Sequence, residues 1–274
     1  MKGILVPTDF SDSANNAIEY AVEIAKPTGA KLILFHVYNI PVVPLEANYI
    51  LPAEELEKST MAGLKKIAKT IHLKHGTDLK IECACQYGFA AEEINIFAEA
   101  HKVDLIVMGL ESAGYLSEKL IGSITTSVMK KSKKPLLAID KGMKYKGIKK
   151  IALACDYNET NNESAVYSLK EFTSLFNAQL YIINVVDELE LVPATNEAAE
   201  AIKVEHLLKG FIHYSYYIKN DDTVSGINKF VEEMSIDMLV MIPHHHSALH
   251  NLFHEADSKH MAFHTKVPLL TLHQ

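Results

Sequence analysis

The chain carries the same pattern of apolar segments twice, and this duplication constrains its fold more than any other feature. The matching segments are MKGILVPTD (1–9) with IKKIALACD (148–156), AKLILFHV (30–37) with AQLYIINV (178–185), and KVDLIVM (102–108) with SIDMLVM (235–241). Repeated segments of this kind indicate two similar domains within one chain. The 274 residues are enough for each domain to bury a core of its own.

Within the first copy, short apolar runs alternate with segments of helical periodicity. Strands are expected over residues 2–7, 31–37, 79–85, 104–108 and 135–139, and helices over residues 13–26, 53–74, 90–101 and 122–132. Pro27 and Gly29 are expected to end the first helix. Continuous apolar strands flanked by helices are typical of parallel sheets that are buried on both faces. We therefore predict an α/β fold made of two tandem doubly wound parallel-sheet domains, which are Rossmann-like.

The polar segment KGMKYKG (141–147) separates the two copies and reads as a connector. We expect domains at residues 1–140 and 148–274. Because the domains are duplicates, they are expected to pack as a pseudo-dimer within the chain, and a homodimer of whole chains is left open.

Charge and composition exclude several classes of partner. A formal net charge of −7 with dispersed lysines argues against nucleic-acid binding, which needs concentrated basic surface. The chain has neither a signal-peptide pattern at its start nor an apolar run long enough for a bilayer, so a cytoplasmic protein without membrane contact is expected. We assign Cys83, Cys85 and Cys155 to reduced core thiols rather than to a redox or metal site, and the tyrosine-rich segment 211–218 to the core.

The segments after the first and fourth strands hold the candidate binding residues, because ligands of such sheets bind outside the carboxyl ends of the strands, where the strand order reverses. Gly109 is expected to let the chain turn sharply after the fourth strand, and Gly122-Ser123 to open a helix whose free N–H groups favour an anion. Asp9 could bond ribose hydroxyls or coordinate a magnesium ion carried by a nucleotide. Helix capping by Asp9, Ser11 or Ser123 is the structural alternative.

These residues resemble the universal stress protein family in its tandem two-domain form. That family has a nucleotide loop of the form GxxG, nine residues, then G followed by S or T, after a strand with a DLIVMG-like ending. Here Gly109, Ser112, nine further residues and Gly122-Ser123 keep the spacing, with Ser112 in place of the second glycine. The VPTDFS opening, the FHV ending of the second strand and the KKPLLAI segment extend the resemblance along the domain.

The resemblance implies ATP binding in the first domain only, with Mg²⁺ as a candidate companion of the nucleotide. It implies that Pro7, Thr8 and Asp9 line the ribose side and that the backbone of Val37 bonds adenine. The residues implied to contact ribose and phosphates are Met108, Gly109, Ser112, Gly122, Ser123 and Ile124.

The second copy has lost the corresponding features. Residues 242–268 place Ile242 where the first copy has Gly109, His245 for Ser112, and Glu255-Ala256 for Gly122-Ser123. A carboxylate at the start of the last helix would repel a phosphate, so no ATP is expected in the second domain by this route. The region is instead rich in histidines, namely His244, His245, His246, His250, His254, His260 and His264. Pairs at helical spacing could share a metal, and a solvated or interface-forming loop is the commoner outcome, so no metal ligand is assigned.

The function expected from these features is that of an ATP-binding, non-catalytic stress-response or signalling module with unidentified protein partners. An ATP-cleaving adenylyl transferase on this architecture is expected to carry a glycine-rich SGGxDS loop after the first strand, where this chain has PTDFSDS. No nucleophile–base pair stands out, so dedicated catalysis is not expected, while slow ATP hydrolysis stays open. A nucleotide-free interaction scaffold and a metal-binding histidine region are the alternatives.

Overall fold

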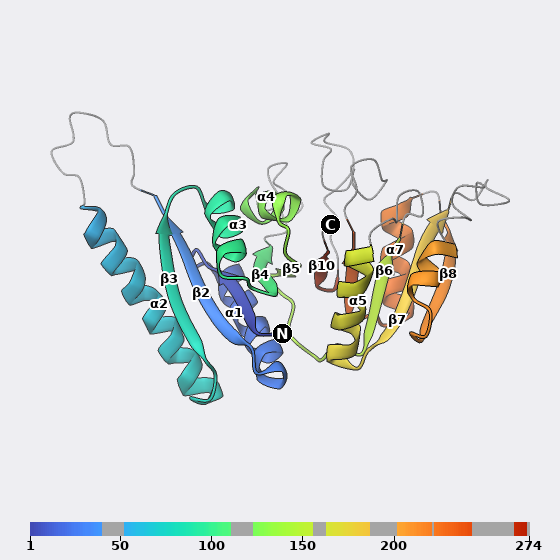
Figure 1. The fold of residues 1–274 in the computed structure, drawn as a ribbon, viewed down its shortest axis with the longest axis horizontal. Coiled ribbons are helices and arrows are strands. Elements are labelled where there is room, and N and C mark those ends of the chain that lie inside the picture. The colour runs from blue at the N-terminus through green and yellow to red at the C-terminus, as the bar shows by residue number, and fades with distance from the viewer. Residues whose placement is uncertain are drawn as a thin grey trace. The chain divides into compact units, whose positions relative to one another are not determined.

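The computed structural model describes residues 1–39, 52–110, 123–155, 163–186, 202–220, 222–242 and 266–272. These residues form two compact units, with the division between Gly142 and Met143. The division falls inside the expected connector 141–147. Each unit is built on a parallel sheet with helices packed against it, which confirms the predicted α/β class (Figure 1).

The first unit follows the predicted order of elements closely. Its strands are β1 (Gly3–Pro7), β2 (Lys31–Tyr38), β3 (Ile81–Tyr87), β4 (Leu105–Leu110) and β5 (Leu136–Asp140), and its helices are α1 (Asp12–Thr28), α2 (Ala53–His75), α3 (Ala90–Ala100) and α4 (Ser123–Lys131). The strand order is β3-β2-β1-β4-β5, and the described pairs are parallel. Every boundary lies within two residues of its predicted place.

The two central strands of the first sheet are apolar on both faces because helices cover both. The side chains without solvent exposure include Ile4, Leu5 and Val6 of β1 and Leu105, Ile106 and Val107 of β4. Each buried side chain of this size contributes roughly 1.5–3 kcal/mol relative to an exposed one. The helices α1 and α2 are in contact on one face, and α3 and α4 are in contact on the other, as right-handed crossovers require for this strand order.

Helix α1 begins and ends with local hydrogen bonds. The Ser11 hydroxyl caps it by accepting the N–H of Ala14 at 3.3 Å. The helix continues through Pro27, so the expectation that Pro27 ends it is wrong. Proline removes only one helical hydrogen bond in this last turn, and Thr28 donates its hydroxyl to the carbonyl of Ile24 at 2.9 Å. The end comes at Gly29, whose left-handed φ of 65° lets its N–H bond the carbonyl of Ala25.

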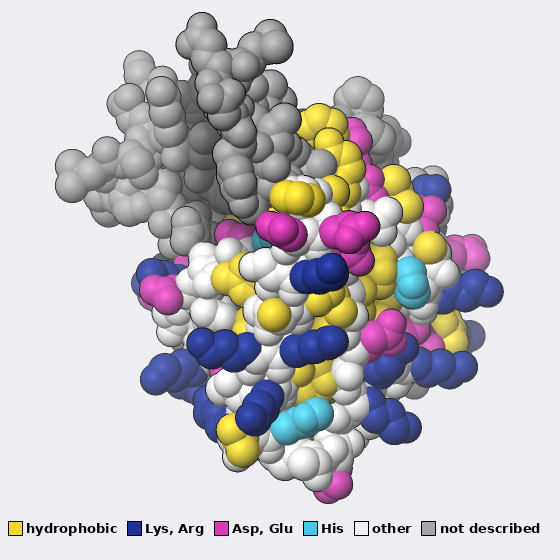
Figure 2. Space-filling view, turned by 90° about the vertical axis from the view of Figure 1, so that its left-hand side faces the viewer, with side chains coloured by type: hydrophobic (Ala, Val, Ile, Leu, Met, Phe, Trp, Pro, Cys, Tyr) yellow, Lys and Arg dark blue, Asp and Glu magenta, His cyan; other side chains and the backbone are white. Residues whose placement is uncertain are grey.

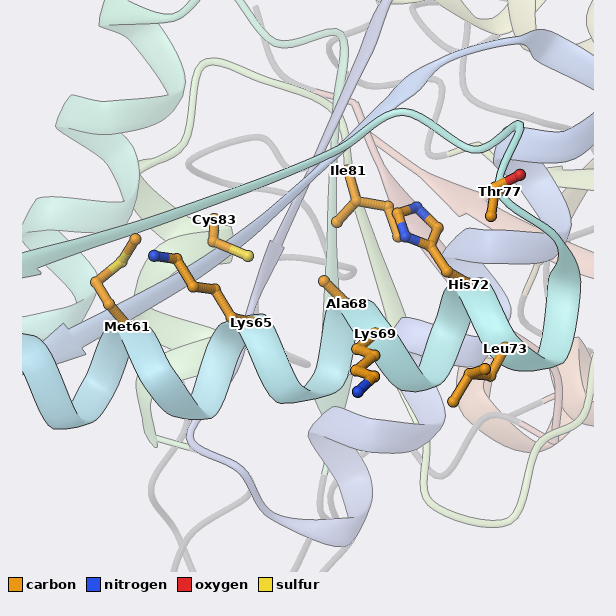
Figure 3. Close-up of a pocket in the computed structure, with 9 residues that line it drawn as sticks. All are labelled: Met61, Lys65, Ala68, Lys69, His72, Leu73, Thr77, Ile81 and Cys83. Atoms are coloured by element: carbon orange, nitrogen blue, oxygen red, sulfur yellow. The ribbon is translucent and has the colours of Figure 1, made fainter.

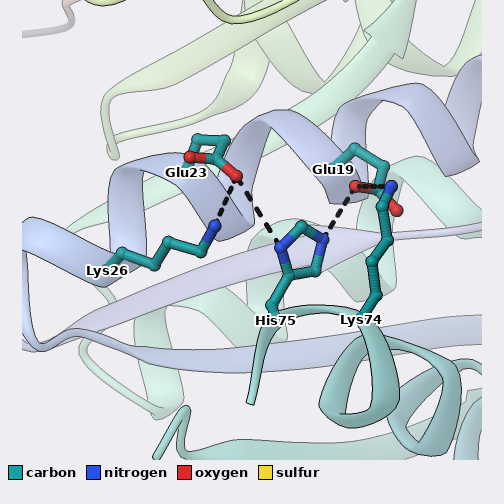
Figure 4. Close-up of polar contacts among 5 residues, drawn as sticks. All are labelled: Glu19, Glu23, Lys26, Lys74 and His75. Carbon is teal, nitrogen blue, oxygen red and sulfur yellow. Dashed lines mark hydrogen bonds and ion pairs between the residues drawn. The ribbon is translucent and has the colours of Figure 1, made fainter.

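An ionic cluster joins α1 to the end of α2 (Figure 4). The carboxylate of Glu19 accepts the Lys74 ammonium at 2.7 Å and lies 3.0 Å from Nε2 of His75. Nδ1 of His75 lies 3.8 Å from Glu23, which also pairs with Lys26 at 2.6 Å. Partial burial acts to raise the pKa of Glu19, but the bonds from Lys74 and His75 outweigh it and leave that pKa lowered.

The second unit repeats the strand order of the first, as β10-β9-β6-β7-β8. Its strands are β6 (Lys150–Ala154), β7 (Gln179–Val186), β8 (His213–Lys219), β9 (Met238–Met241) and β10 (Leu269–Thr271), its helices are α5 (Glu163–Phe176) and α7 (Thr223–Glu233), and residues 202–207 are also helical. The described pairs in this sheet are parallel as well.

The tyrosine-rich strand β8 is not part of the core, so its assignment to the core is wrong. It lies at the edge of the second sheet, and Tyr214, Tyr216 and Tyr217 are 45%, 38% and 54% exposed. An edge strand has only one neighbouring strand, and the burial of its side chains depends on the helices beside it. Tyr216 still packs on Phe230 of α7, with ring centroids 5.1 Å apart.

One carboxylate in each unit holds the start of the first strand in that unit. The side chain of Asp104 accepts the backbone N–H groups of Lys2 and Gly3. In the second unit the side chain of Asp237 accepts the backbone N–H groups of Lys149, at 2.8 Å, and of Lys150, at 2.9 Å. The duplication seen in the sequence therefore extends to individual hydrogen bonds.

The cysteines are free thiols, but only Cys155 lies in the core, at 6% exposure. Cys83 and Cys85 are half-buried because β3 is the edge strand of the first sheet, so their assignment to the core is wrong. Among the helices that the structure describes, none is both long enough and apolar enough to cross a bilayer.

Candidate functional site

The candidate site lies where β1 and β4 end side by side. These strands pair at Ile4 with Leu105 and at Leu5 with Ile106, and their crossovers lead in opposite directions, to β2 and to β5. This is the reversal point at which sheets of this class bind ligands. The arrangement brings the carboxyl ends of β1 and β4, and so Pro7 and Met108, to one edge of the sheet, and both side chains are buried.

The turn after β1 is fixed by its own polar side chains. The N–H of Thr8 donates to the carbonyl of Phe35 at 2.8 Å, and the Thr8 hydroxyl accepts the N–H of Phe10 at 3.0 Å. Asp9 accepts the N–H of Ser11 at 3.0 Å through one carboxylate oxygen. Of the residues after β1 that could cap α1, it is Ser11 that does so. Asp9 is exposed, and its second oxygen makes no hydrogen bond with any described residue, whereas Thr8 is only 6% exposed and is held in the turn.

His36 and Phe10 support this turn, and the sequence analysis did not single them out. Nδ1 of His36 lies 2.6 Å from the carbonyl oxygen of Thr8, and because a carbonyl only accepts, Nδ1 carries the proton. Phe10 has a left-handed φ of 66°, and its ring centroid lies 4.8 Å from that of His36. Phe10 also contacts Gly63 of α2, where an added Cβ would lie 3.1 Å from the ring.

In the second unit a different side chain donates the equivalent hydrogen bond to the end of the first strand. Asn184 occupies the position of His36 in the repeat, and its side-chain amide donates to the carbonyl of Cys155 at 3.0 Å. Cys155 in turn matches Thr8. A comparison of the two copies for paired polar residues could therefore have identified His36 from the sequence.

Val37 has main-chain groups available beside the end of β1. The described pairs between β1 and β2 stop at Pro7 and Phe35, while β2 runs on to Tyr38. Because the Phe35 carbonyl faces β1 and alternate residues of a strand direct their backbone groups to the same side, the N–H and C=O of Val37 also face the β1 side. No described residue of β1 pairs with them, so a ligand at this edge could bond both.

Gly109 lies inside β4 rather than in a turn, so the expectation that it turns the chain after β4 is wrong. The strand continues to Leu110, and Gly109 pairs with Ile139 of β5. Its lack of a side chain serves a close backbone approach instead: an added Cβ would lie 2.6 Å from the carbonyl carbon and oxygen of Ser13 in α1. This contact explains Gly109 without a ligand.

The start of α4 is tied to the same strand end. The hydroxyl of Thr125 donates to the carbonyl of Gly109 at 2.8 Å. Ser123 is the first residue of α4, so the capping position precedes it, and Ile124 is 44% exposed. The first turn of α4 has no acidic residue and its last turn has Lys130 and Lys131. Because the described first turn carries no acidic side chain, the dipole of this helix favours an anion at its start.

Several predicted positions lie outside the described residues. In the first copy of the sequence these are Ser112 and Gly122, and in the second copy they are Asp156, His245, Glu255-Ala256 and the other histidines between His244 and His264. Ile242, the counterpart of Gly109, is described and is buried at 4% exposure, so the second unit accommodates a full side chain there. Among the described residues, no group of three histidine, cysteine, aspartate or glutamate side chains could hold a metal ion.

The first copy of the repeat matches a known protein family. The family model described as the universal stress protein family matches residues 1–140. Two universal stress proteins of Methanocaldococcus jannaschii are similar to the chain: one is 35% identical over 146 residues, covering 52% of this chain and 84% of the relative, and the other is 31% identical over 152 residues, covering 50% and 94%.

A whole-chain comparison of folds agrees with the tandem arrangement. The fold is similar to the crystal structure of a universal stress protein from Archaeoglobus fulgidus, with a TM-score of 0.73 at 16% sequence identity. The match covers 99% of this chain and 98% of the Archaeoglobus chain. This identity establishes the fold alone. The family model and the relatives establish more: the chain belongs to the universal stress protein family.

Proposed function

We propose that the first unit binds an adenine nucleotide, with ATP as the candidate, at the shared edge of β1 and β4. The observation that carries the proposal is the position of Val37, whose backbone N–H and C=O face the space beyond the end of β1. A donor and an acceptor side by side match the edge of an adenine base. This argument rests on the alternation of backbone groups along β2 and makes no use of residues 111–122, which lie outside the described residues.

The other residues have complementary roles in the proposal. Asp9, with a carboxylate oxygen left over from the turn, would bond the ribose hydroxyls or a magnesium ion that accompanies the phosphates. The N-terminus of α4, at Ser123, would face the phosphates with its free N–H groups. Pro7, Thr8, Met108 and Gly109 would shape the edge, with Thr8 acting mainly through the turn that it holds.

The module is proposed to be non-catalytic, with nucleotide occupancy changing its shape or its choice of protein partner. The second unit is proposed to be a degenerate copy without ATP. A nucleotide-free scaffold is the competing function, and the contact of Gly109 with Ser13 favours it, since that glycine has a structural reason of its own.

Calorimetric titration of the full chain with ATP, and with GTP for comparison, tests the proposal. Val37→Pro removes the N–H that faces the β1 side and leaves the backbone bonds to β3 in place, so it should raise the Kd for ATP by about tenfold, the equivalent of one lost hydrogen bond of roughly 1.4 kcal/mol. Val185→Pro, at the matching position of β7, is the control and should leave binding unchanged. Gly122→Glu should abolish binding by placing a carboxylate at the start of α4.

Three results would each contradict a part of the proposal. Equal heats for the unaltered chain and Gly122→Glu would exclude residue 122 from the site, and absence of any ATP binding would favour the scaffold. Steady ATP turnover above a buffer control would contradict the non-catalytic role.

A further inference from the structure

A second surface of the first unit has the features of a binding site, and it lies between α2 and β3. It is a shallow groove of about 480 Å³ with an apolar floor and lysines beside it (Figure 3). The residues that define it are Met61, Lys65, Ala68 and Lys69 of α2 with Ile81 and Cys83 of β3. Its volume is within the range of ordinary ligand sites, although the groove is open along its length.

Helix α2 is poorly covered along this groove. Only Leu64 and Ile71 among its 23 residues are buried, and Leu73 is 79% exposed. Figure 2 faces this side of the molecule and shows a strip of hydrophobic side chains with dark-blue side chains beside it. These are all lysines, because the sequence contains no arginine. An apolar strip rimmed by charge is typical of a surface that binds a partner.

The outer edge of β3 is open beside the groove. Among the described strands, β3 pairs only with β2, and it contributes seven residues without a proline or a lysine to protect the edge. The carbonyl of Lys80 accepts the N–H of Leu32, and the N–H of Gly88 donates to Tyr38, so alternate residues of β3 face β2. Ile81, Cys83 and Cys85 therefore direct their N–H and C=O groups outward.

The charges along the groove change from one end to the other. At Cys83 burial raises the thiol pKa, the nearby Lys65 ammonium opposes that rise, and the Glu82 carboxylate adds to it. At Cys85 burial again raises the thiol pKa, but here the carboxylate of Glu57 adds to the effect. The acidic Glu82 is bound to Lys31 at 2.6 Å on the opposite face of the sheet. Lys65 and Lys69 line the groove beside Ile81 and Cys83, so this end of the groove carries the positive charges.

We propose that this surface binds an extended acidic segment of a partner protein, which adds as a strand to the outer edge of β3. Main-chain bonds to Ile81 and Cys83 would hold the segment, its apolar side chains would lie on Met61 and Ala68, and its carboxylates would meet Lys65 and Lys69. Strand addition of this kind draws its affinity from the main chain and its specificity from alternate side chains. The site is separate from the β1–β4 edge, so the inference does not depend on nucleotide binding.

A second copy of this chain fits the surface less well. A symmetric pairing of two β3 edges would place Lys65 and Lys69 of one copy near the same lysines of the other. Like charges so placed oppose association, whereas a carboxylate-bearing strand neutralises them.

The test is fluorescence anisotropy of the full chain with a labelled, capped peptide in which glutamate alternates with valine. Binding is expected, with an affinity that falls as salt is added. A peptide in which lysine replaces glutamate should not bind. N-methylation of every second residue should abolish binding in one register and spare it in the other, because only one side of the added strand bonds to β3.

Variants of the chain separate the contributions. Lys65→Glu with Lys69→Glu should raise the Kd of the acidic peptide by at least about tenfold. Lys130→Glu, an exposed change on α4, is the matched control and should have no effect. Cys83→Pro removes one outward N–H and should weaken binding, with thermal unfolding as the check that the chain still folds.

Labelling of thiols gives an independent measurement. In a Cys85→Ser background, the acidic peptide should slow the reaction of Cys83 with a thiol reagent, while the buried Cys155 reacts slowly with or without peptide. The proposal is overturned if both N-methylated peptides bind like the parent, if charge reversal at Lys65 and Lys69 leaves the Kd unchanged, or if the chain dimerises through these lysines without peptide.

Discussion

The backbone of Ser13 in α1 occupies the space that a side chain on Gly109 of β4 would need. An added Cβ would lie 2.6 Å from the Ser13 carbonyl carbon and oxygen, so one of the two elements would have to move. Gly109→Ala is therefore expected to lower the free energy of unfolding by about 1–3 kcal/mol, the usual cost of overpacking. Denaturant titration measures this loss, and Gly142→Ala is the control, since nothing lies within 4 Å of its added Cβ.

Removal of either strand-start carboxylate should destabilise the chain. Asp104→Ala and Asp237→Ala each leave two backbone N–H groups without their acceptor. Hydrogen bonds to a charged group contribute about 1.5–3 kcal/mol each, but these N–H groups are near the surface and water replaces part of the loss, so about 1–3 kcal/mol in total is expected. Hydrogen exchange should show the loss mainly in the unit that carries the change. An equal loss of protection in both units would contradict the view that each carboxylate stabilises mainly its own unit.

His36→Asn should be tolerated better than His36→Leu. The asparagine has a counterpart in Asn184, which already donates to the equivalent carbonyl in the second unit, whereas leucine leaves the Thr8 carbonyl without this donor. We expect His36→Leu to cost about 1–3 kcal/mol and His36→Asn clearly less. Urea unfolding of the two variants side by side measures the difference, and equal losses would show that the ring contact with Phe10 matters more than the hydrogen bond.

The Glu19 cluster should make stability depend on pH in acid solution. The folded chain lowers the pKa of Glu19, so its bonds to Lys74 and His75 are fully stabilising above about pH 5, and the stabilisation is lost as the pH falls through the lowered pKa. Because Glu19 is 42% exposed, Glu19→Gln should cost only about 0.5–1 kcal/mol near pH 7. Unfolding of both chains across pH 3–7 measures this, and the two curves should converge at the acid end. A constant difference over the whole range would rule out the carboxylate as the cause.

Much of the fold was predictable because the apolar pattern is strong. The runs ILV and LIV lie on central strands whose side chains are buried on both faces. The prediction at Pro27 was wrong because a proline in the last turn of a helix removes only one backbone hydrogen bond. The exposed tyrosines of β8 and the half-buried Cys83 were wrongly assigned to the core because a sequence does not say which strand is at an edge.

The placement of the candidate residues in the fold was predictable, but their supporting contacts were not. Pro7, Thr8 and Asp9 were expected at the sheet edge, and the structure brings that segment beside the end of β4. The contact of Gly109 with Ser13 depends on the distance between a helix and a strand that are far apart in sequence. The free backbone groups of Val37 depend on where a neighbouring strand stops.

The carboxylates of Asp104 and Asp237 lie at the amino ends of β1 and β6, opposite the carboxyl ends where ligands of such sheets bind. The bonds that hold the strand starts thus lie at one end of each sheet, and the candidate binding residues of the first unit lie at the other end. The two ends can therefore differ independently of each other: the second unit keeps the strand order and the Asp237 bonds, although Ile242 takes the place of Gly109 and histidines follow it in the sequence.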